Sequence, residues 1–217
     1  MIAIMQPYYL PFLGYFQLIN KVDKFIIFDD IKFEKSGYLT SNKIKNSKLI
    51  LFIKNRNKVS IIKEKFLASE MKNYVNKLRK NLMQNYVFFN EDIFNKLFQI
   101  PNNLSYFDFI FNQIKYVCKL LDIKTELLIS SKIIDTTNAK SHEKIFAICK
   151  KVNDMDYVNP ISGKKLYNKK IDLFKKNKIN LNYFSYHPYL KNNKDDFSIL
   201  HLLFTYTISE IKSSLFV

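Results

Sequence analysis

Two short apolar runs, separated by a stretch of helical length, most constrain how this chain can fold. Ile2–Met5 and Phe25–Phe28 are continuous apolar segments, and residues 14–20 between them have the pattern of an amphipathic helix. A buried strand, a helix and a second buried strand predict a βαβ unit with parallel strands. The loops that carry function in a parallel sheet emerge at the carboxyl ends of its strands. We therefore expect Gln6 and Asp29, which follow the two strands, to lie close together.

The same alternation is expected to return in the second half of the chain. The middle has apolar residues spaced by three and four, which predicts three helices, with Ser69 and Ser105 as N-caps of two of them. The expected fold is α/β, with a parallel-sheet core of the Rossmann or HUP type and a helical insertion. We expect one domain over residues 1–217, with the helical elaboration at 65–122. Further strands are predicted at 49–53, 59–62, 127–129, 157–159 and 181–184, and further helices at 145–152, 171–176 and 198–206.

The composition predicts a compact, soluble protein. The chain has 217 residues, 47% of them hydrophobic, with only three Gly and five Pro, so a string of flexible linkers is excluded. Its apolar runs fall short of the roughly 18 residues that a membrane span needs. Residues 1–5 lack the basic region of a signal peptide. We expect a cytoplasmic protein without a membrane span; the sequence does not predict its oligomeric state.

The cysteines and histidines do not form a recognisable metal site. Cys118 and Cys149 both lie in apolar periodic segments, which predicts buried free thiols in a reducing compartment. The three histidines are far apart in sequence and none has a neighbour at zinc-ligand spacing. We therefore expect no metal.

The net charge of +16 has two interpretations. It is typical of proteins that bind nucleic acid or anionic ligands, and a basic field would also attract phosphorylated small molecules. However, every basic residue except Arg56 and Arg79 is Lys, whereas direct readout of bases and phosphates favours Arg. Lys, Asn, Ile and Phe are all abundant, as an AT-rich coding bias would produce. Both explanations remain open.

Several sequence motifs stand out in both halves of the chain: MQPYYLPFLGYFQLI at 5–19, VDKF at 22–25, FDD at 28–30, FEKSGY at 33–38, NKI at 42–44, YVNPISG at 157–163 and LY at 166–167. Together these motifs resemble those of the WbqC-like family. The resemblance implies a setting more than a reaction, because members are typically encoded beside enzymes of O-antigen and other surface-glycan synthesis, and in some natural-product pathways. From that setting, transfer of an acyl or aminoacyl group to an amino-sugar nucleotide is the leading hypothesis.

The chain departs from the family pattern at three places. Ser36 and Ser41 stand where the family usually has arginines, so Lys35 and Lys43 would have to hold any anion. His201 stands where the family tends to have Asp, so no role of that Asp is carried over.

A second, weaker likeness is to the HxGH loop of nucleotide-binding HUP folds. Both histidines of that motif are replaced, by Phe12 and Tyr15, which argues against nucleotidyl transfer. The helix N-terminus beside Gly14 could still hold a phosphate.

Asp29, Lys35, Gln6 and Tyr15 are the predicted catalytic residues, by loop position and by their match to the family motif. Asp29 would act as a base or an orienting group, with Lys35 as its cationic partner. Gln6 and Tyr15 would position the acyl donor. The alternative for Asp29 is a structural loop cap.

The other candidates are assigned to substrate binding. They supply hydrogen-bonding groups, charge or a rigid loop, and the set near 160 is a second polar turn that is expected to face the first loop, although turn chemistry alone would also explain it. They are Pro7, Tyr8, Gly14, Gln17, Asp30, Asn42, Lys43, Asn159, Ser162 and Gly163.

The expected substrate is a nucleotide-linked sugar. The acyl or aminoacyl donor would be acyl-CoA, an acyl-carrier protein or an aminoacyl-tRNA. Two alternatives stay open: a non-catalytic module that binds a sugar nucleotide or a carrier protein, and a tRNA-binding aminoacyl-transfer protein, which would give the basic charge a use.

Overall fold

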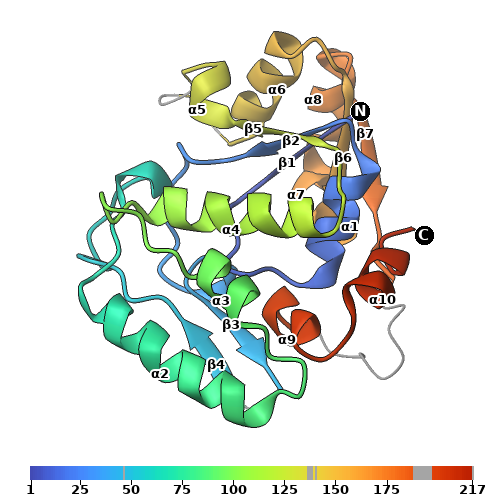
Figure 1. Ribbon diagram of the computed structural model, residues 1–217. Coiled ribbons are helices and arrows are strands. Elements are labelled where there is room, and N and C mark those ends of the chain that lie inside the picture. Colours follow the sequence, from blue (N-terminus) through green and yellow to red (C-terminus); the bar gives the residue numbers. More distant parts are fainter. Residues whose placement is uncertain (46, 136–138, 140, 188–196, 217) are drawn as a thin grey trace.

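A five-stranded parallel sheet forms the centre of the molecule. The computed structural model describes residues 1–45, 47–135, 139, 141–187 and 197–216 (Figure 1). Its sheet has the order β5-β2-β1-β6-β7, and each neighbouring pair is parallel. The strands are β1 (Ile2–Met5), β2 (Lys24–Ile27), β5 (Glu126–Ile129), β6 (Asp156–Pro160) and β7 (Asn180–Phe184).

The predicted βαβ unit is confirmed. β1 and β2 pair in parallel, with Ile2 opposite Lys24 and Met5 opposite Ile27. The backbone N–H of Phe28 extends the pairing by donating to the carbonyl of Met5 at 2.8 Å. The segments that follow the two strands therefore emerge at the same edge of the sheet, as expected for a Rossmann-like α/β core.

The strand order reverses between β1 and β6. From β1 the chain proceeds outward on one side through β2 and β5, then crosses to β6 and β7 on the other side of β1. In open parallel sheets, the crevice outside the carboxyl ends of the strands at this reversal is the usual ligand site.

Helices cover both faces of the sheet (Figure 1). Alternate residues of a strand point to opposite faces, and accordingly Ala3 and Phe25 belong to one apolar cluster while Ile2 and Ile26 belong to another. The first cluster includes α1 (Leu13–Lys21) and α4 (Tyr106–Leu120); the second includes α6 (Ser141–Lys151) and α8 (Ile171–Lys176). Burial on both faces explains why the central strands β1 and β2 are nearly continuous apolar runs.

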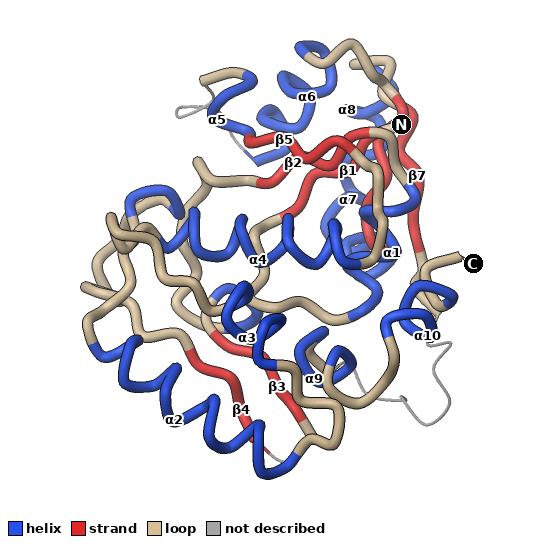
Figure 2. The backbone as a smooth tube through the Cα atoms, viewed as in Figure 1, coloured by secondary structure: helices blue, strands red, loops and turns tan. Residues whose placement is uncertain are grey.

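A hairpin and two helices lie beyond α4, on its side away from the sheet (Figure 2). The hairpin is antiparallel, β3 (Ser41–Ile44) with β4 (Ser47–Ile50), and the helices are α2 (Glu70–Asn85) and α3 (Glu91–Leu97). The three helices expected in the middle of the chain are thus present as α2, α3 and α4. The hydroxyl of Ser105 caps α4 by accepting from the backbone N–H of Asp108 at 3.1 Å, as predicted.

Two strand predictions in this region were wrong. β4 begins and ends earlier than the predicted 49–53, and the strand that pairs with it, β3, was not foreseen. Residues 59–62 form no strand, because their backbone groups pair with an irregular segment: Phe33 N–H donates to Ser60 O at 2.9 Å and Ile62 N–H donates to Ile31 O at 3.0 Å. A 3-10 turn, Ile62–Glu64, follows.

The C-terminal helix predicted at 198–206 is shorter and is followed by another. α9 (Ile199–Leu203) ends before Thr207, whose side chain caps α10 (Ile208–Ser213) in a capping box with Glu210. The other short helices are α5 (Ser130–Ile133) and α7 (Lys164–Tyr167), with 3-10 turns at Gly37–Leu39, Ile161–Gly163 and Asn168–Lys170. None of the described helices combines the length and apolar character that crossing a bilayer requires.

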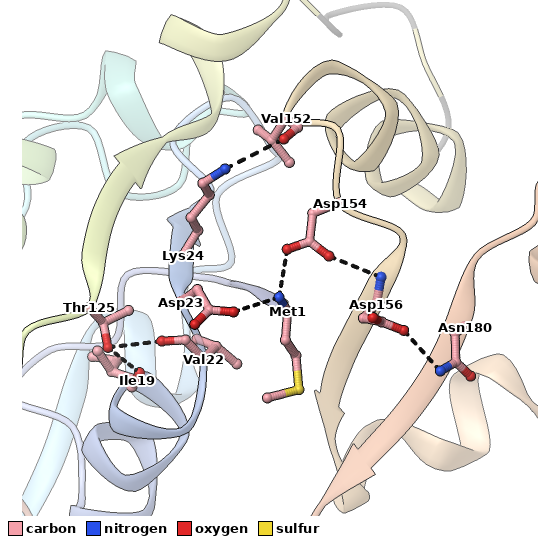
Figure 3. Close-up of polar contacts among 10 residues, drawn as sticks. All are labelled: Met1, Ile19, Val22, Asp23, Lys24, Thr125, Val152, Asp154, Asp156 and Asn180. Carbon is pink, nitrogen blue, oxygen red and sulfur yellow. Dashed lines mark hydrogen bonds and ion pairs between the residues drawn. The ribbon is translucent and has the colours of Figure 1, made fainter.

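Polar contacts fasten the amino-terminal edge of the sheet, opposite the crevice (Figure 3). The amino group of Met1 lies 2.7 Å from Asp23 Oδ2 and 2.6 Å from Asp154 Oδ2, which joins β1 to the segments before β2 and β6. The side chain of Asn180 donates to Asp156 at 2.9 Å and so links β7 to β6. These groups are partly exposed, and we assign them alignment of the strands rather than a large share of stability.

Both cysteines are buried and unpaired, as expected from their apolar surroundings. Burial raises the pKa of each thiol, Cys118 and Cys149, to about 12. Neither thiol lines the cavity described next.

Candidate active site

A cavity of about 640 Å³ opens where the strand order reverses. Its walls come from the ends of β1 and β6, the segment after β2, and α6. The residues that matter for its chemistry are Gln6, Tyr8, Asp30, Lys32, Glu34, Lys144, Asn159, Ser162, Gly163 and Tyr167. Six of these, Gln6, Tyr8, Asp30, Asn159, Ser162 and Gly163, were predicted from the sequence. The two polar turns expected to face each other are thus brought together in one cavity.

Tyr15 holds the loop after β1 in place through a hydrogen bond. This residue is only 2% exposed, and its hydroxyl donates to the backbone carbonyl of Gln6 at 2.9 Å. Burial raises the pKa of the Tyr15 phenol well above its ordinary value, so the hydroxyl stays protonated and available as a donor. The ring of Tyr8 lies 5.5 Å from that of Tyr15, and Pro7 is buried. Gln6 itself lines the cavity, whereas Tyr15 and Pro7 fix the loop that presents it.

The two acids after β2 occupy different positions. Asp29 is buried beside α5: its Oδ1 accepts from Ser130 Oγ at 2.9 Å and from the backbone N–H of Ser131 at 3.0 Å, and its Oδ2 accepts from Ser131 Oγ at 2.6 Å. Asp30 lies in the cavity wall, and its Oδ1 is 2.6 Å from Ser130 Oγ, whose single proton is shared between the two carboxylates. Asp29 thus has the contacts of a residue that holds the loop, and Asp30, although buried, is the acid that lines the cavity.

Lys144 is the functional candidate that sequence reasoning missed. Its Nζ lies 3.4 Å from Asp30 Oδ2 and donates to the backbone carbonyl of Asp30 at 2.9 Å, and the two side chains are only 7% and 2% exposed. A buried ion pair is costly to desolvate and persists where both groups find partners. One available signal was a Lys directly before the apolar positions 145 and 146 of a predicted helix. Ser130 and Ser131, which directly follow β5, would have been found by extending the strand-end rule to that strand.

The turn after β6 is tightly packed. Asn159 accepts from the Tyr157 hydroxyl at 3.0 Å and donates to the carbonyl of Pro160 at 3.1 Å, so its amide is engaged on both sides. A Cβ at Gly163 would lie 2.0 Å from the Asn159 amide nitrogen, which explains the glycine. Ser162 is exposed at the cavity mouth and is therefore open to a ligand.

Three predicted binding residues support the fold outside the cavity. Gln17 is buried and donates to the carbonyls of His187 at 2.9 Å and Ser214 at 2.6 Å, fastening two C-terminal segments. Asn42 donates to the carbonyls of Tyr9 at 3.1 Å and Leu10 at 2.8 Å. Gly14 lies under the ring of Tyr186, where a Cβ would be 2.6 Å from Tyr186 Cγ.

The two lysines expected to hold an anion are exposed and lie outside the cavity lining. The backbone carbonyl of Lys35 accepts from Arg56 Nη2 at 2.6 Å, so Arg56 ties down the loop that carries Lys35. Lys43 Nζ lies 5.1 Å from the ring centre of Phe197. Lys32 is the exposed lysine that does line the cavity, and the chain brings it there through the irregular segment after β2.

Comparison with known proteins agrees with the resemblance seen in the sequence. The WbqC-like protein family matches residues 6–213. A relative from Mycobacterium tuberculosis (strain ATCC 25618 / H37Rv), named Uncharacterized protein Rv1507c, is 44% identical over 52 residues. That alignment covers 24% of this chain and 22% of the relative. No solved structure matches the chain.

Proposed function

Because this chain belongs to the WbqC-like protein family, we propose that it is a group-transfer enzyme of surface-polysaccharide (O-antigen type) or related biosynthesis. It would move an acyl or aminoacyl group onto the amine of a nucleotide-linked amino sugar. The observation that carries this proposal is the polar cavity at the reversal of strand order, with the buried Asp30–Lys144 pair in its wall. Acids held in place in such a crevice are typical of sites that handle protons.

The cavity suits a polar, ring-shaped substrate. Its volume of about 640 Å³ lies within the range of roughly 300–1,000 Å³ found for small-molecule sites. Tyr8 and Tyr167 offer flat faces for a sugar ring or base, and Gln6 and Ser162 offer hydrogen bonds to hydroxyl groups. Lys32 at the rim would attract the phosphates of a sugar nucleotide.

Asp30 is the proposed proton acceptor. In the proposed step, the neutral amine nitrogen of the sugar forms a bond to the acyl carbonyl carbon. The bond between that carbon and the sulfur or oxygen of the donor breaks. The proton released by nitrogen passes to the Asp30 carboxylate and then to the departing thiolate or alkoxide. Lys144 is a positioning residue that fixes Asp30 through two contacts, and Asp29 fixes the same loop through Ser130 and Ser131.

Asp30→Asn tests this assignment against the earlier one to Asp29. The substitution keeps the volume of the side chain but removes the base, so turnover should fall by at least about 100-fold, the scale of general-base catalysis. The loss of the buried pair with Lys144 should also lower the free energy of unfolding, by roughly 3–5 kcal/mol, so turnover would be compared at a temperature where both proteins are folded. Product formation would be followed by mass spectrometry with amino-sugar nucleotides and acyl-CoA, acyl-carrier protein or aminoacyl-tRNA as donors.

Asp29→Asn and Asp172→Asn complete that experiment. Asp172 is exposed and lies outside the cavity, so it controls for the loss of one carboxylate. Asp29→Asn should lower the melting temperature more than it lowers turnover, since its contacts are with the protein. Turnover that survives in Asp30→Asn but is lost in Asp29→Asn at unchanged stability would return the catalytic role to Asp29. Binding of a sugar nucleotide without product from any donor would favour a binding module.

A further inference from the structure

A second cavity, of about 760 Å³, lies between the β3–β4 hairpin, the end of α2 and α9. These three elements lie side by side at the end of the molecule away from the parallel sheet (Figure 1). Among the described residues, none lines both this cavity and the one at the sheet edge. The function proposed above does not use it, and the chemistry of its walls differs from that of the first cavity.

Aromatic side chains make up much of its wall. Tyr86 packs against Phe204 with ring centres 6.2 Å apart, and Phe197 lies 4.7 Å from the His201 ring. Phe88, at the rim, is 54% exposed although it is a large apolar side chain. Flat side chains around an open cavity favour a flat ligand, because aromatic pairs gain from offset or edge-to-face contact beyond the area they bury. The aromatic residues of the lining are Tyr86, Phe88, Phe197, Phe204 and Tyr206.

His201 contributes a hydrogen-bond donor to this wall. It is 7% exposed, and its Nδ1 lies 2.8 Å from the hydroxyl of Tyr86. Burial raises the pKa of the Tyr86 phenol, so its hydroxyl keeps its proton and can donate it to Nδ1 of the neutral ring. Burial, and secondarily the charge of Lys45, lower the pKa of His201, which keeps the ring neutral at neutral pH. A neutral ring that accepts at Nδ1 carries its proton on Nε2, and Nε2 has no partner among the described residues.

The charge of the lining is positive. Lys45 lines the cavity, and Lys43 lies close to it, with its Nζ 5.1 Å from the ring centre of Phe197. The described lining includes no Asp or Glu. Electrostatic complementarity therefore favours an anionic ligand.

We propose that this cavity binds an aromatic anion: a flat ring packed among the aromatic side chains, with a carboxylate or phosphate group facing His201 Nε2–H and the Lys45 ammonium. Nucleotides and aryl carboxylates share this chemistry. The neutral, buried imidazole would orient the anionic group through a hydrogen bond, and the exposed lysine would attract it through its positive charge. His201 and Lys45 come from segments far apart in the sequence, and the fold places both in the lining of this cavity.

Titration with two probes tests the proposal and separates the two sources of the anion. Adenosine 5′-monophosphate represents nucleotides, and 4-hydroxybenzoate represents aryl carboxylates. Two control compounds each carry one feature: adenosine has the aromatic ring without the anionic group, and inorganic phosphate has the anionic group without the ring. The chain has three histidines, so the ring signals of His201 can be assigned by substitution and followed by NMR. At least one probe should bind saturably and shift the His201 signals, and should bind more tightly than both half-probes. Failure of both probes to bind would overturn the proposal.

Matched variants locate the site. Lys45→Gln should weaken binding of the effective probe about three- to fivefold, the scale of an exposed ion pair. Lys48→Gln is the control, because Lys48 is an exposed lysine of the same hairpin that lies outside the lining. His201→Asn keeps an acceptor for the Tyr86 hydroxyl but removes Nε2, and it should weaken binding further. Equal affinity in the wild type, Lys45→Gln and His201→Asn would overturn the proposal. If His201→Asn does not fold, the probe affinities of Lys45→Gln and Lys48→Gln are compared instead, and equal affinities would overturn the proposal.

Discussion

At the residue scale, neighbouring side chains from distant segments decide what a candidate residue does. The sequence placed Asp29 and Asp30 together at a strand end, and both are there. Which of the two faces the cavity depends on Ser130 and Ser131, which lie about 100 residues further along the chain. A local motif contains no such information. The same holds for Lys144, whose buried partner became visible only once α6 was placed against the loop after β2.

Gly14 gives a residue-scale prediction about packing at the start of α1. A Cβ there would lie 2.5 Å from Phe12 Cε2 and 2.7 Å from Tyr186 Cβ, too close for real contacts. Gly14→Ala should therefore lower the free energy of unfolding by about 3 kcal/mol, the upper part of the range for overpacking. Thermal and urea denaturation would measure it.

Gly37→Ala is the matched control for that experiment. Gly37 has a φ of +73° and nothing within 4 Å of its Cβ position, so only the left-handed backbone opposes the substitution, at about 1 kcal/mol. A Gly14→Ala protein that melts with the wild type would show that α1 and the segment at Tyr186 are less closely packed than the structure has them.

At the element scale, the helices and strands with a clear pattern of apolar residues were predictable from the sequence, and the irregular segments were not. β1, β2 and β5 consist mainly of apolar residues, β6 and β7 mix apolar residues with Asn, and α2 and α4 have clear apolar stripes; all were predicted from the sequence. Residues 59–62 resemble a strand in composition, yet their partners belong to an irregular segment at 31–33, so they form one isolated antiparallel bridge, Lys32 with Ile61, and not a strand. β3 has a polar sequence, Ser41–Ile44, and depends on packing of Ile44 and on the partner strand.

Thr125 gives a prediction about how α1 ends. Its hydroxyl lies 2.7 Å from the carbonyl of Ile19 and 3.0 Å from that of Val22, so it joins the last turn of the helix to the start of β5 (Figure 3). Thr125→Val keeps the shape but leaves these carbonyls without that donor. We expect a loss of about 1–2 kcal/mol in the free energy of unfolding, measured by urea denaturation. Ser213→Ala, which removes an exposed hydroxyl bonded to Glu210 O at 2.8 Å, should cost less than about 0.5 kcal/mol. Equal effects of the two substitutions would contradict a capping role for Thr125.

At the scale of the whole molecule, the positive charge and the position of the cavity become connected. The basic residues behind the net charge of +16 are spread along the whole sequence, so the charge alone did not indicate where a binding site lies. The fold brings Lys32 to the cavity rim and leaves Lys35 exposed outside the lining. Composition alone could not distinguish these two lysines, because the irregular segment that separates them has no periodic pattern.

Salt dependence of ligand binding tests this connection. If the general field and Lys32 both attract the phosphates of a sugar nucleotide, affinity should fall as salt rises, since the Debye length shrinks from about 10 Å at 0.1 M to about 3 Å at 1 M. Lys32→Gln should weaken binding at low salt and reduce this dependence. Lys35→Gln, its matched control, should do both to a smaller degree because Lys35 lies outside the cavity lining. Calorimetric titration of each variant at two salt concentrations provides the measurement. An affinity that does not change with salt would argue against phosphate attraction by the basic surface, and an effect of Lys35→Gln as large as that of Lys32→Gln would place the phosphates over the 33–38 loop instead of the cavity rim.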